Sequence, residues 1–251
     1  MKKKKRRGSS RYYFIYIFLI LLIIMSVIGI RSLITKLSFF EISEIKIMGN
    51  HNLEKDFLKN LSKDCYGKNL YAISKNEIQR RYTNIVRVKN ANISRIFPHK
   101  LRIKIVERLG LFYLKTKEGE LFPIDNEKIV LDNDNFYSAE ILPVIETDLK
   151  KENIVYGETI ENDFVNKVFD FYEKVQLEDK EFIDKISEFY LENGDICMTE
   201  VNIGYKIIFG EDDIRSKLLR FNFLEKNKGF EKDNIVDLRF SNQLIVGREN
   251  S

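Results

Sequence analysis

The side chains that most often carry out chemistry are scarce in this sequence. It has two cysteines, Cys65 and Cys197, and two histidines, His51 and His99. Neither cysteine lies at a metal-binding spacing, and no GxSxG, HExxH or glycine-rich phosphate-binding motif occurs. Both histidines adjoin turn-forming residues, which indicates exposed loops. We therefore expect no catalytic residue, no metal ligand and no cofactor.

Neither the acidic residues nor the cysteines indicate a catalytic or metal site. The chain has 38 acidic residues, but they are scattered and no pair is singled out as a general acid and base. Two cysteines do not make a disulfide scaffold, so two partly buried free thiols are favoured over one bridge. A membrane-anchored enzyme remains an alternative class, in which substitution of a single acid would abolish function.

The first thirty-one residues point to a membrane. Seven basic residues lie between Lys2 and Arg11, and the nineteen residues from Tyr12 to Ile30 carry no charge. As a helix this uncharged run spans about 28 Å, close to the thickness of a bilayer's hydrocarbon core. Basic residues before a first span stay in the cytoplasm. We predict a cytoplasmic tail over 1–11, a transmembrane helix over 12–30 and a connector over 31–38, with the rest outside the cytoplasm.

A cleaved signal peptide is the alternative interpretation of this segment. It requires a shorter apolar core followed by small residues, whereas the sequence from Ile28 to Leu33 is a poor cleavage site. A retained anchor in the cytoplasmic (inner) membrane, in contact with its lipid, is therefore favoured.

The charge of the remaining chain argues against nucleic acid as a partner. Residues 1–31 hold eight of the 42 basic residues and no acid, so residues 32–251 carry 34 basic and 38 acidic groups, a net charge of −4. The overall net charge of +4 thus belongs to the tail, and the main body lacks a basic stripe.

Residues 39–108 predict a small β-α-α-β-β domain. Leu101, Ile103 and Ile105 alternate with basic residues, which is typical of a half-buried strand. Ser74 and Glu77 form a capping box that opens a helix. The expected elements are a strand over 41–48, a helix over 53–61, a helix over 75–82, a strand over 86–93 with a bulge near Asn90, and a strand over 101–105.

Residues 109–247 predict a β-rich domain with helices on a mostly antiparallel sheet, followed by a short tail over 248–251. Its turn signals are Lys117–Gly119 and Glu192–Gly194. The expected elements are a short buried segment at 142–145, helices over 164–175 and 212–224, and strands over 205–209, 235–240 and 244–246, with a turn at 241–243. The fold class is therefore α+β.

Six short motifs occur in order along these elements. They are Gly49-Asn50, Gly67–Leu70, Arg95–Leu101 leading into Ile103–Arg108, Leu142-Pro143, Ile203-Gly204 with Phe209-Gly210, and Ile235–Val246. With them the sequence resembles the FtsQ/DivIB family of bacterial cell-division proteins over essentially its whole length. It departs from the family pattern at Phe97, where Trp often stands, and at Gly110, where Ala often stands. The resemblance implies that the first domain is of POTRA type.

The resemblance also implies a function. Members of this family are non-enzymatic scaffolds that link division proteins at the mid-cell septum. They bind FtsB/DivIC-like and FtsL-like bitopic proteins and other divisome proteins. Alignment on the motif Asp237-Leu-Arg239 carries the partner contact onto Phe240 and Asn242, with Leu244 and Val246 on the following strand.

The position of the last strand agrees with this implication. A strand so near the C-terminus is a natural sheet edge, and an open edge presents unpaired N–H and C=O groups to which a partner strand can add. A further hypothesis is that residues 39–108 recruit other division or envelope proteins. The alternative function is a POTRA protein that assists polypeptide transport or outer-membrane assembly; such proteins usually carry a C-terminal β-barrel.

Overall fold

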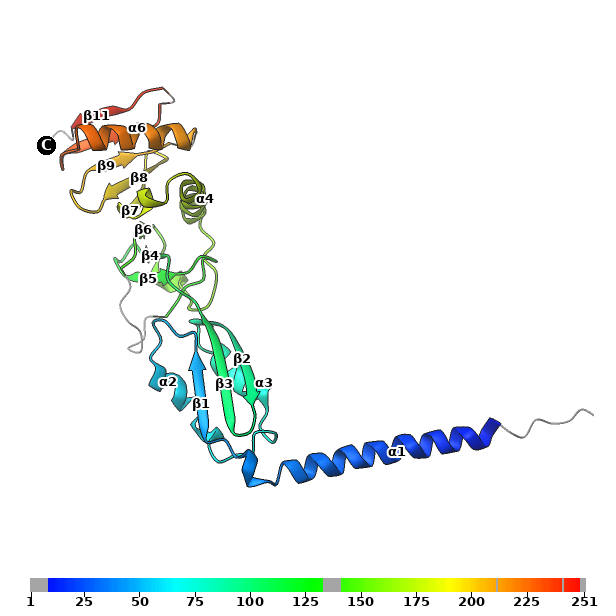
Figure 1. Ribbon diagram of the computed structural model, residues 1–251. Helices are drawn as coiled ribbons and strands as arrows, with labels where there is room; N and C mark the ends of the chain where they lie inside the picture. The colour runs from blue at the N-terminus through cyan, green and yellow to red at the C-terminus, as the bar shows by residue number, and fades with distance from the viewer. Residues whose placement is uncertain (1–8, 133–140, 211, 241, 249–251) are drawn as a thin grey trace, which may run out of the picture. The chain divides into compact units, whose positions relative to one another are not determined.

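The computed structural model describes residues 9–132, 141–210, 212–240 and 242–248 (Figure 1). They form two compact units, one ending at Glu107 and the other beginning at Arg108. The first unit opens with helix α1, Ser9–Ile34. Its apolar stretch Tyr12–Ile34 is long enough to cross a membrane, and its most apolar part is not buried against the rest of the protein. The expected tail over 1–11 lies mostly outside the described residues.

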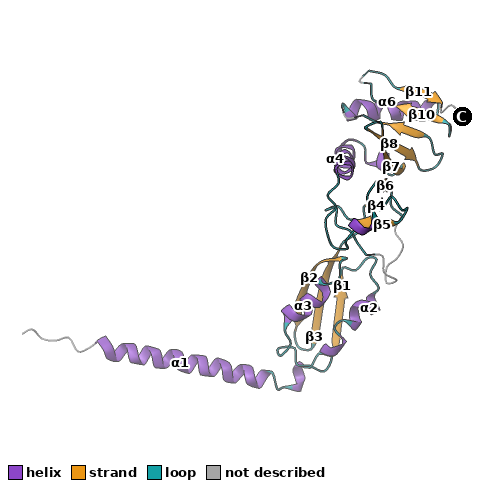
Figure 2. Ribbon diagram, turned by 180° about the vertical axis from the view of Figure 1, so that it is seen from behind, coloured by secondary structure: helices purple, strands orange, loops and turns teal. Residues whose placement is uncertain are grey.

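The first domain has the predicted β-α-α-β-β order. Its elements are β1 (Glu44–Met48), α2 (Lys55–Asn60), α3 (Lys75–Thr83), β2 (Val88–Ile96) and β3 (Lys100–Glu107). Strands lie side by side in the order β1-β3-β2 (Figure 2), with β1 parallel and β2 antiparallel to β3. The register shift between Val88 and Asn90 confirms the predicted bulge.

Local signals in this domain act as the sequence predicted. The Ser74 hydroxyl accepts a hydrogen bond from the Glu77 amide at 3.3 Å and so caps α3. The side chains of Leu101, Ile103 and Ile105, which alternate along β3, are buried as predicted. In α3, the Tyr82 hydroxyl lies within hydrogen-bond distance of the Leu58 carbonyl and the Ser62 hydroxyl, so the two helical segments are tied together.

Several predicted boundaries in this domain are wrong: the strands predicted over 86–93 and 101–105 run from Val88 to Ile96 and from Lys100 to Glu107. The first strand begins at Glu44 rather than Glu41, because Glu41 instead forms an isolated bridge with Asn69. The first helix is six residues long rather than about three turns, because the chain tightens into a 3-10 turn at Lys63–Cys65. At the first strand a contact distant in sequence overrides the local periodicity.

The second domain is a mixed sheet with helices. Its strands are β4 (Phe112–Lys115), β5 (Leu121–Ile124), β6 (Val144–Glu146), β7 (Ile186–Glu192), β8 (Asp195–Glu200), β9 (Lys206–Ile208), β10 (Asn234–Asp237) and β11 (Ile245–Arg248). Within the described ranges their order is β11-β10-β9-β8-β7-β6-β4-β5. Four of the neighbouring pairs are antiparallel, and β4–β6, β6–β7 and β9–β10 are parallel.

One apolar core joins the helices of this domain to the sheet. The helices are α4 (Asp163–Glu178), α5 (Lys180–Ile183) and α6 (Ile214–Asn227). Phe182 of α5 packs edge-to-face on Phe209 after β9 and on Phe221 of α6. Such aromatic pairs add to the stabilisation that burial provides. Helix α6 thereby lies beside the β9–β11 end of the sheet, as both views show (Figures 1 and 2).

Candidate functional site

Strand β11 forms one edge of the second sheet, next to the C-terminus of the described residues. Strand β11 pairs with β10 in antiparallel register, with Asp237 opposite Ile245 and Asn234 opposite Arg248. Among the described residues no strand pairs with the other side of β11. That side presents the backbone N–H and C=O groups of an edge strand, which are available to another chain.

The side chains of β11 are exposed on both faces of the sheet. Ile245 is 42% exposed and Val246 is 47% exposed, and Gly247 and Arg248 are exposed as well. The opposite strand is much more covered, since Val236 of β10 is fully buried. Proteins usually protect an edge with charged residues or proline; here Arg248 supplies a charge at the end of β11 only, and the exposed Ile245 and Val246 give its first half the features of an interaction surface.

The residues that the resemblance singled out gather around this edge. Phe240 is exposed, and its carbonyl oxygen accepts a hydrogen bond from Arg220 of α6 at 3.5 Å. Asn242 is exposed in the connection to β11, and Val246 faces solvent. Leu244 differs from the other three, because its side chain packs against the apolar core. It therefore holds the start of β11 in place.

Two boundaries at this edge differ from the prediction. The expected strand over 235–240 ends at Asp237, and the last strand begins at Ile245 rather than Leu244. Part of the predicted turn at 241–243, Ser241, lies outside the described residues, as does most of the predicted tail over 248–251.

A groove runs between β11 and the end of α6. Its volume is about 570 Å³. Leu224 and Leu244 provide apolar walls, and an ion pair of 2.9 Å between Arg248 and Glu231 lies at its side. Polar and charged groups line this groove together with the two leucines, so it suits a side chain with both apolar and polar parts that projects from an added strand.

Two ion pairs connect the end of β10 to β8. Burial opposes ionisation of Asp237 at the end of β10, but hydrogen bonds from Arg239 outweigh it and hold the pKa of that carboxyl below its usual value. Arg239 also pairs with Asp195 of β8 at 2.9 Å. The three side chains thus connect β8 to the segment that leads into Phe240.

Lys217 fixes α6 to the same region. It is almost completely buried, and its ammonium group donates a hydrogen bond to the Phe209 carbonyl at 3.2 Å. Burial lowers the pKa of Lys217. No sequence signal distinguishes Lys217 from the neighbouring basic residues Arg215 and Arg220.

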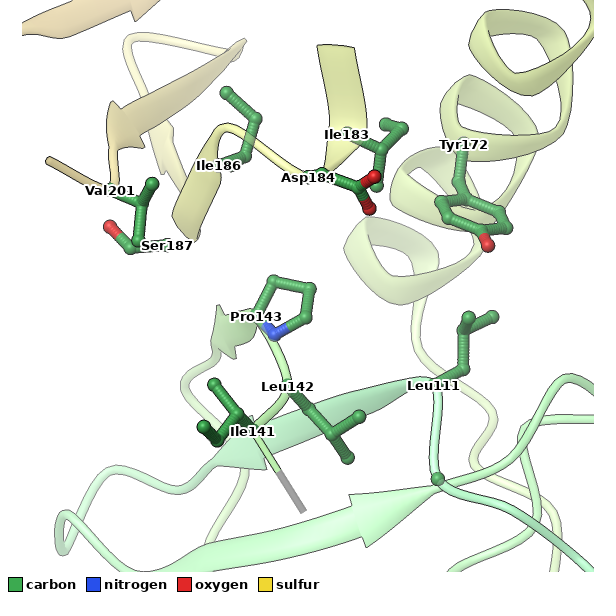
Figure 3. Close-up of a pocket in the computed structure, with 11 residues that line it drawn as sticks. Leu111, Ile141, Leu142, Pro143, Tyr172, Ile183, Asp184, Ile186, Ser187 and Val201 are labelled. Carbon is green, nitrogen blue, oxygen red and sulfur yellow. The ribbon is translucent and has the colours of Figure 1, made fainter. Parts of the chain in front are cut away.

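A second cavity lies at the start of β4, β6 and β7 (Figure 3). It has a volume of about 390 Å³ and is lined mainly by apolar side chains such as Leu111, Pro143 and Ile186, with Asp184 and Ser187 as polar members. A lone carboxylate and a hydroxyl do not make a nucleophile with its base. Within the described part of the chain there is likewise no group of His, Cys, Asp or Glu able to hold a metal ion.

The two cysteines are buried and free. Burial raises the pKa of both the Cys65 and the Cys197 thiol, which makes each a poor nucleophile at neutral pH. The free thiols agree with the sequence prediction.

This chain is similar to a known domain family and to individual proteins of known name. The family described as POTRA domain, FtsQ-type, matches residues 40–108. The cell division protein DivIB of Clostridium tetani is 26% identical over 233 residues, covering 88% of this chain and 85% of that protein. DivIB of Clostridium acetobutylicum is 24% identical and covers 83% of each chain. DivIB of Clostridium botulinum, strain Hall, is 30% identical over 101 residues, which is 40% of this chain and 39% of that protein.

Proposed function

This chain belongs to the FtsQ/DivIB family of bacterial cell-division proteins, and from that membership we propose that it is a non-enzymatic scaffold of the division septum. The proposed partners are FtsB/DivIC-like and FtsL-like bitopic proteins together with other divisome proteins. The proposed mode of capture is addition of a partner strand to the free side of β11.

The observation that carries this proposal is the exposure of β11. An apolar strand with an unpaired backbone edge gains main-chain hydrogen bonds and side-chain burial when another strand adds to it. Phe240 and Val246 would pack on the incoming segment, Asn242 would donate or accept hydrogen bonds, and Leu244 would hold the strand. The groove beside Leu224 would take an alternate side chain of the partner.

The proposed placement follows from α1. The segment Tyr12–Ile34 is apolar and long enough to span a bilayer, and the basic residues before it favour a cytoplasmic N-terminus. The POTRA-type domain over 39–108 and the β domain over 109–247 would then stand outside the cytoplasm. In that arrangement the partners meet β11 outside the membrane, where their own exported segments lie.

The test is binding by variants of β11 in the detergent-solubilised full chain. Val246→Lys places a charge where the added strand would bury an apolar side chain, and loss of that burial predicts about tenfold weaker binding. Leu191→Lys is the matched control, because Leu191 of β7 is 52% exposed and lies elsewhere in the same sheet. Co-purification of FtsB/DivIC-like and FtsL-like proteins from membrane extract is the measurement.

Three outcomes separate the possibilities. Loss of binding in Val246→Lys with retention in Leu191→Lys supports strand addition at β11. Equal retention by both variants, and by Phe240→Ala, rejects this site and directs attention to the POTRA-type domain. No retention by the folded wild-type chain rejects the scaffold function. Deletion of residues 235–251 would be a poorer test, because Val236 and Leu238 belong to the core.

A further inference from the structure

Four aromatic side chains form a cluster at one end of the POTRA-type domain. Phe39 and Phe40 lie in the 3-10 turn Ser38–Phe40, Tyr71 follows the motif Gly67–Leu70, and Phe97 lies at the turn between β2 and β3. The ring of Phe97 lies 5.9 Å from Phe39 and 5.8 Å from Phe40, and Phe40 lies 5.2 Å from Tyr71, all edge to face. We call these four residues the aromatic cluster.

The outer members of the aromatic cluster face solvent. Phe39 is 61% exposed and Phe97 is 65% exposed. Arg95 is also exposed; its guanidinium lies 5.7 Å from the centre of the Tyr71 ring and donates a hydrogen bond to the Ile73 carbonyl at 2.9 Å. Packing within the domain thus holds the cluster together but leaves the rings of Phe39 and Phe97 open to solvent.

The cluster is tied to the end of the apolar helix α1. Phe39 follows Ile34 by five residues, so a fully extended connector separates them by at most about 18 Å. The Asn69 amide donates hydrogen bonds to the carbonyls of Ile34 and Leu37, at 2.9 and 3.0 Å. Two backbone oxygens near the helix end are thereby held against the domain that carries the aromatic rings.

We propose that Phe39 and Phe97 enter the headgroup region of the membrane on the exported side, so that the POTRA-type domain binds lipid directly. The inference depends on the proposed anchoring by α1. Apolar and aromatic side chains favour the boundary between headgroups and acyl chains, and the connector keeps the cluster within reach of that boundary. Lys36, between the helix and Phe39, and Arg95 add positive charge suited to anionic lipids.

Tryptophan fluorescence offers a direct test, because the chain has no tryptophan. The full chain carrying Phe97→Trp, or Phe39→Trp as a second reporter, is reconstituted into vesicles of phosphatidylglycerol and phosphatidylcholine. Part of the lipid is brominated near the headgroup end of its acyl chains. Val106→Trp is the matched control: Val106 is 46% exposed and lies six residues along β3 from Lys100, about 20 Å from the hairpin end.

We expect blue-shifted, bromine-quenched emission from the tryptophans at 97 and 39, and unquenched emission at 106. Flotation of the vesicles with bound protein tests anchoring separately. Protein that floats without selective quenching at 97 and 39 overturns lipid contact while anchoring stands, and the cluster is then a protein-binding surface. Protein that does not float overturns both the anchoring and the lipid contact.

Discussion

Glu107 joins the end of β3 to the turn that follows β1, and replacing it should make the POTRA-type domain easier to unfold. At the end of β3, its buried carboxylate accepts hydrogen bonds from the backbone amides of His51, Asn52 and Leu53, at 2.5, 3.1 and 2.9 Å. These three residues connect β1 to α2. The carboxylate of Glu107 therefore accepts hydrogen bonds from three consecutive backbone amides of this turn.

The size of the effect follows from these contacts. Glu107→Ala leaves three amides without their acceptor, and each unsatisfied buried donor costs about 1–3 kcal/mol. Because His51 is exposed and water can reach its amide, we expect the low end of the sum, about 3 kcal/mol. For a domain of this size that loss corresponds to a decrease in Tm of about 12–24 °C.

The measurement is urea and thermal unfolding of residues 39–108. Glu44→Ala is the matched control, because Glu44 forms an exposed ion pair with Lys100 and solvent-exposed pairs of this kind add little to stability. Glu107→Gln, which keeps one acceptor oxygen, should fall between the two. If Glu107→Ala costs no more than Glu44→Ala, the carboxylate does not hold the turn and the reasoning is refuted.

Two more predictions concern the same domain. Gly49 has a φ of +86°, and a Cβ there would lie 2.2 Å from the Ile105 carbonyl oxygen, so Gly49→Ala should cost more than about 3 kcal/mol. Gly67→Ala, at a similar φ but in open space, should cost about 1 kcal/mol; equal losses in urea unfolding would contradict this. Hydrogen bonds from Arg81 lower the pKa of Asp64 to about 2. Because that folded-state pKa is depressed, the stabilisation is present above the usual value of 3.8 and is lost as pH falls through about 2. Unfolding of Asp64→Asn should therefore vary less with pH between these values than wild type, and parallel curves would disprove the assignment.

Ion pairs and a buried hydrogen bond connect the elements around the proposed partner site. Arg239 links Asp237 to Asp195, and Lys217 links α6 to the end of β9. The edge strand itself is exposed, so its position relies on Leu244 and on pairing with β10. A preformed edge lowers the ordering cost of strand addition.

Sequence patterns within single helices and strands were sufficient to predict much of the fold. The uncharged run from Tyr12 predicted α1, the alternation around Ile103 predicted β3, and Ser74 predicted the start of α3. Each depends on a helical or strand period, or on a cap, within one element. Element ends were less predictable, as at Glu41, because a contact with Asn69 far along the chain decides where β1 begins.

What the sequence determined by itself was therefore the class of protein: an apolar N-terminal helix, a β-α-α-β-β domain and a β-rich domain, each encoded by local patterns. Only the tertiary structure decided which polar groups are buried, such as Glu107 against three amides and Lys217 against a carbonyl. It also brought Phe39 and Phe97 together and left β11 exposed on both faces. These features depend on residues distant in sequence, and the free energies of burial and hydrogen bonding that select them arise only when the chain has folded.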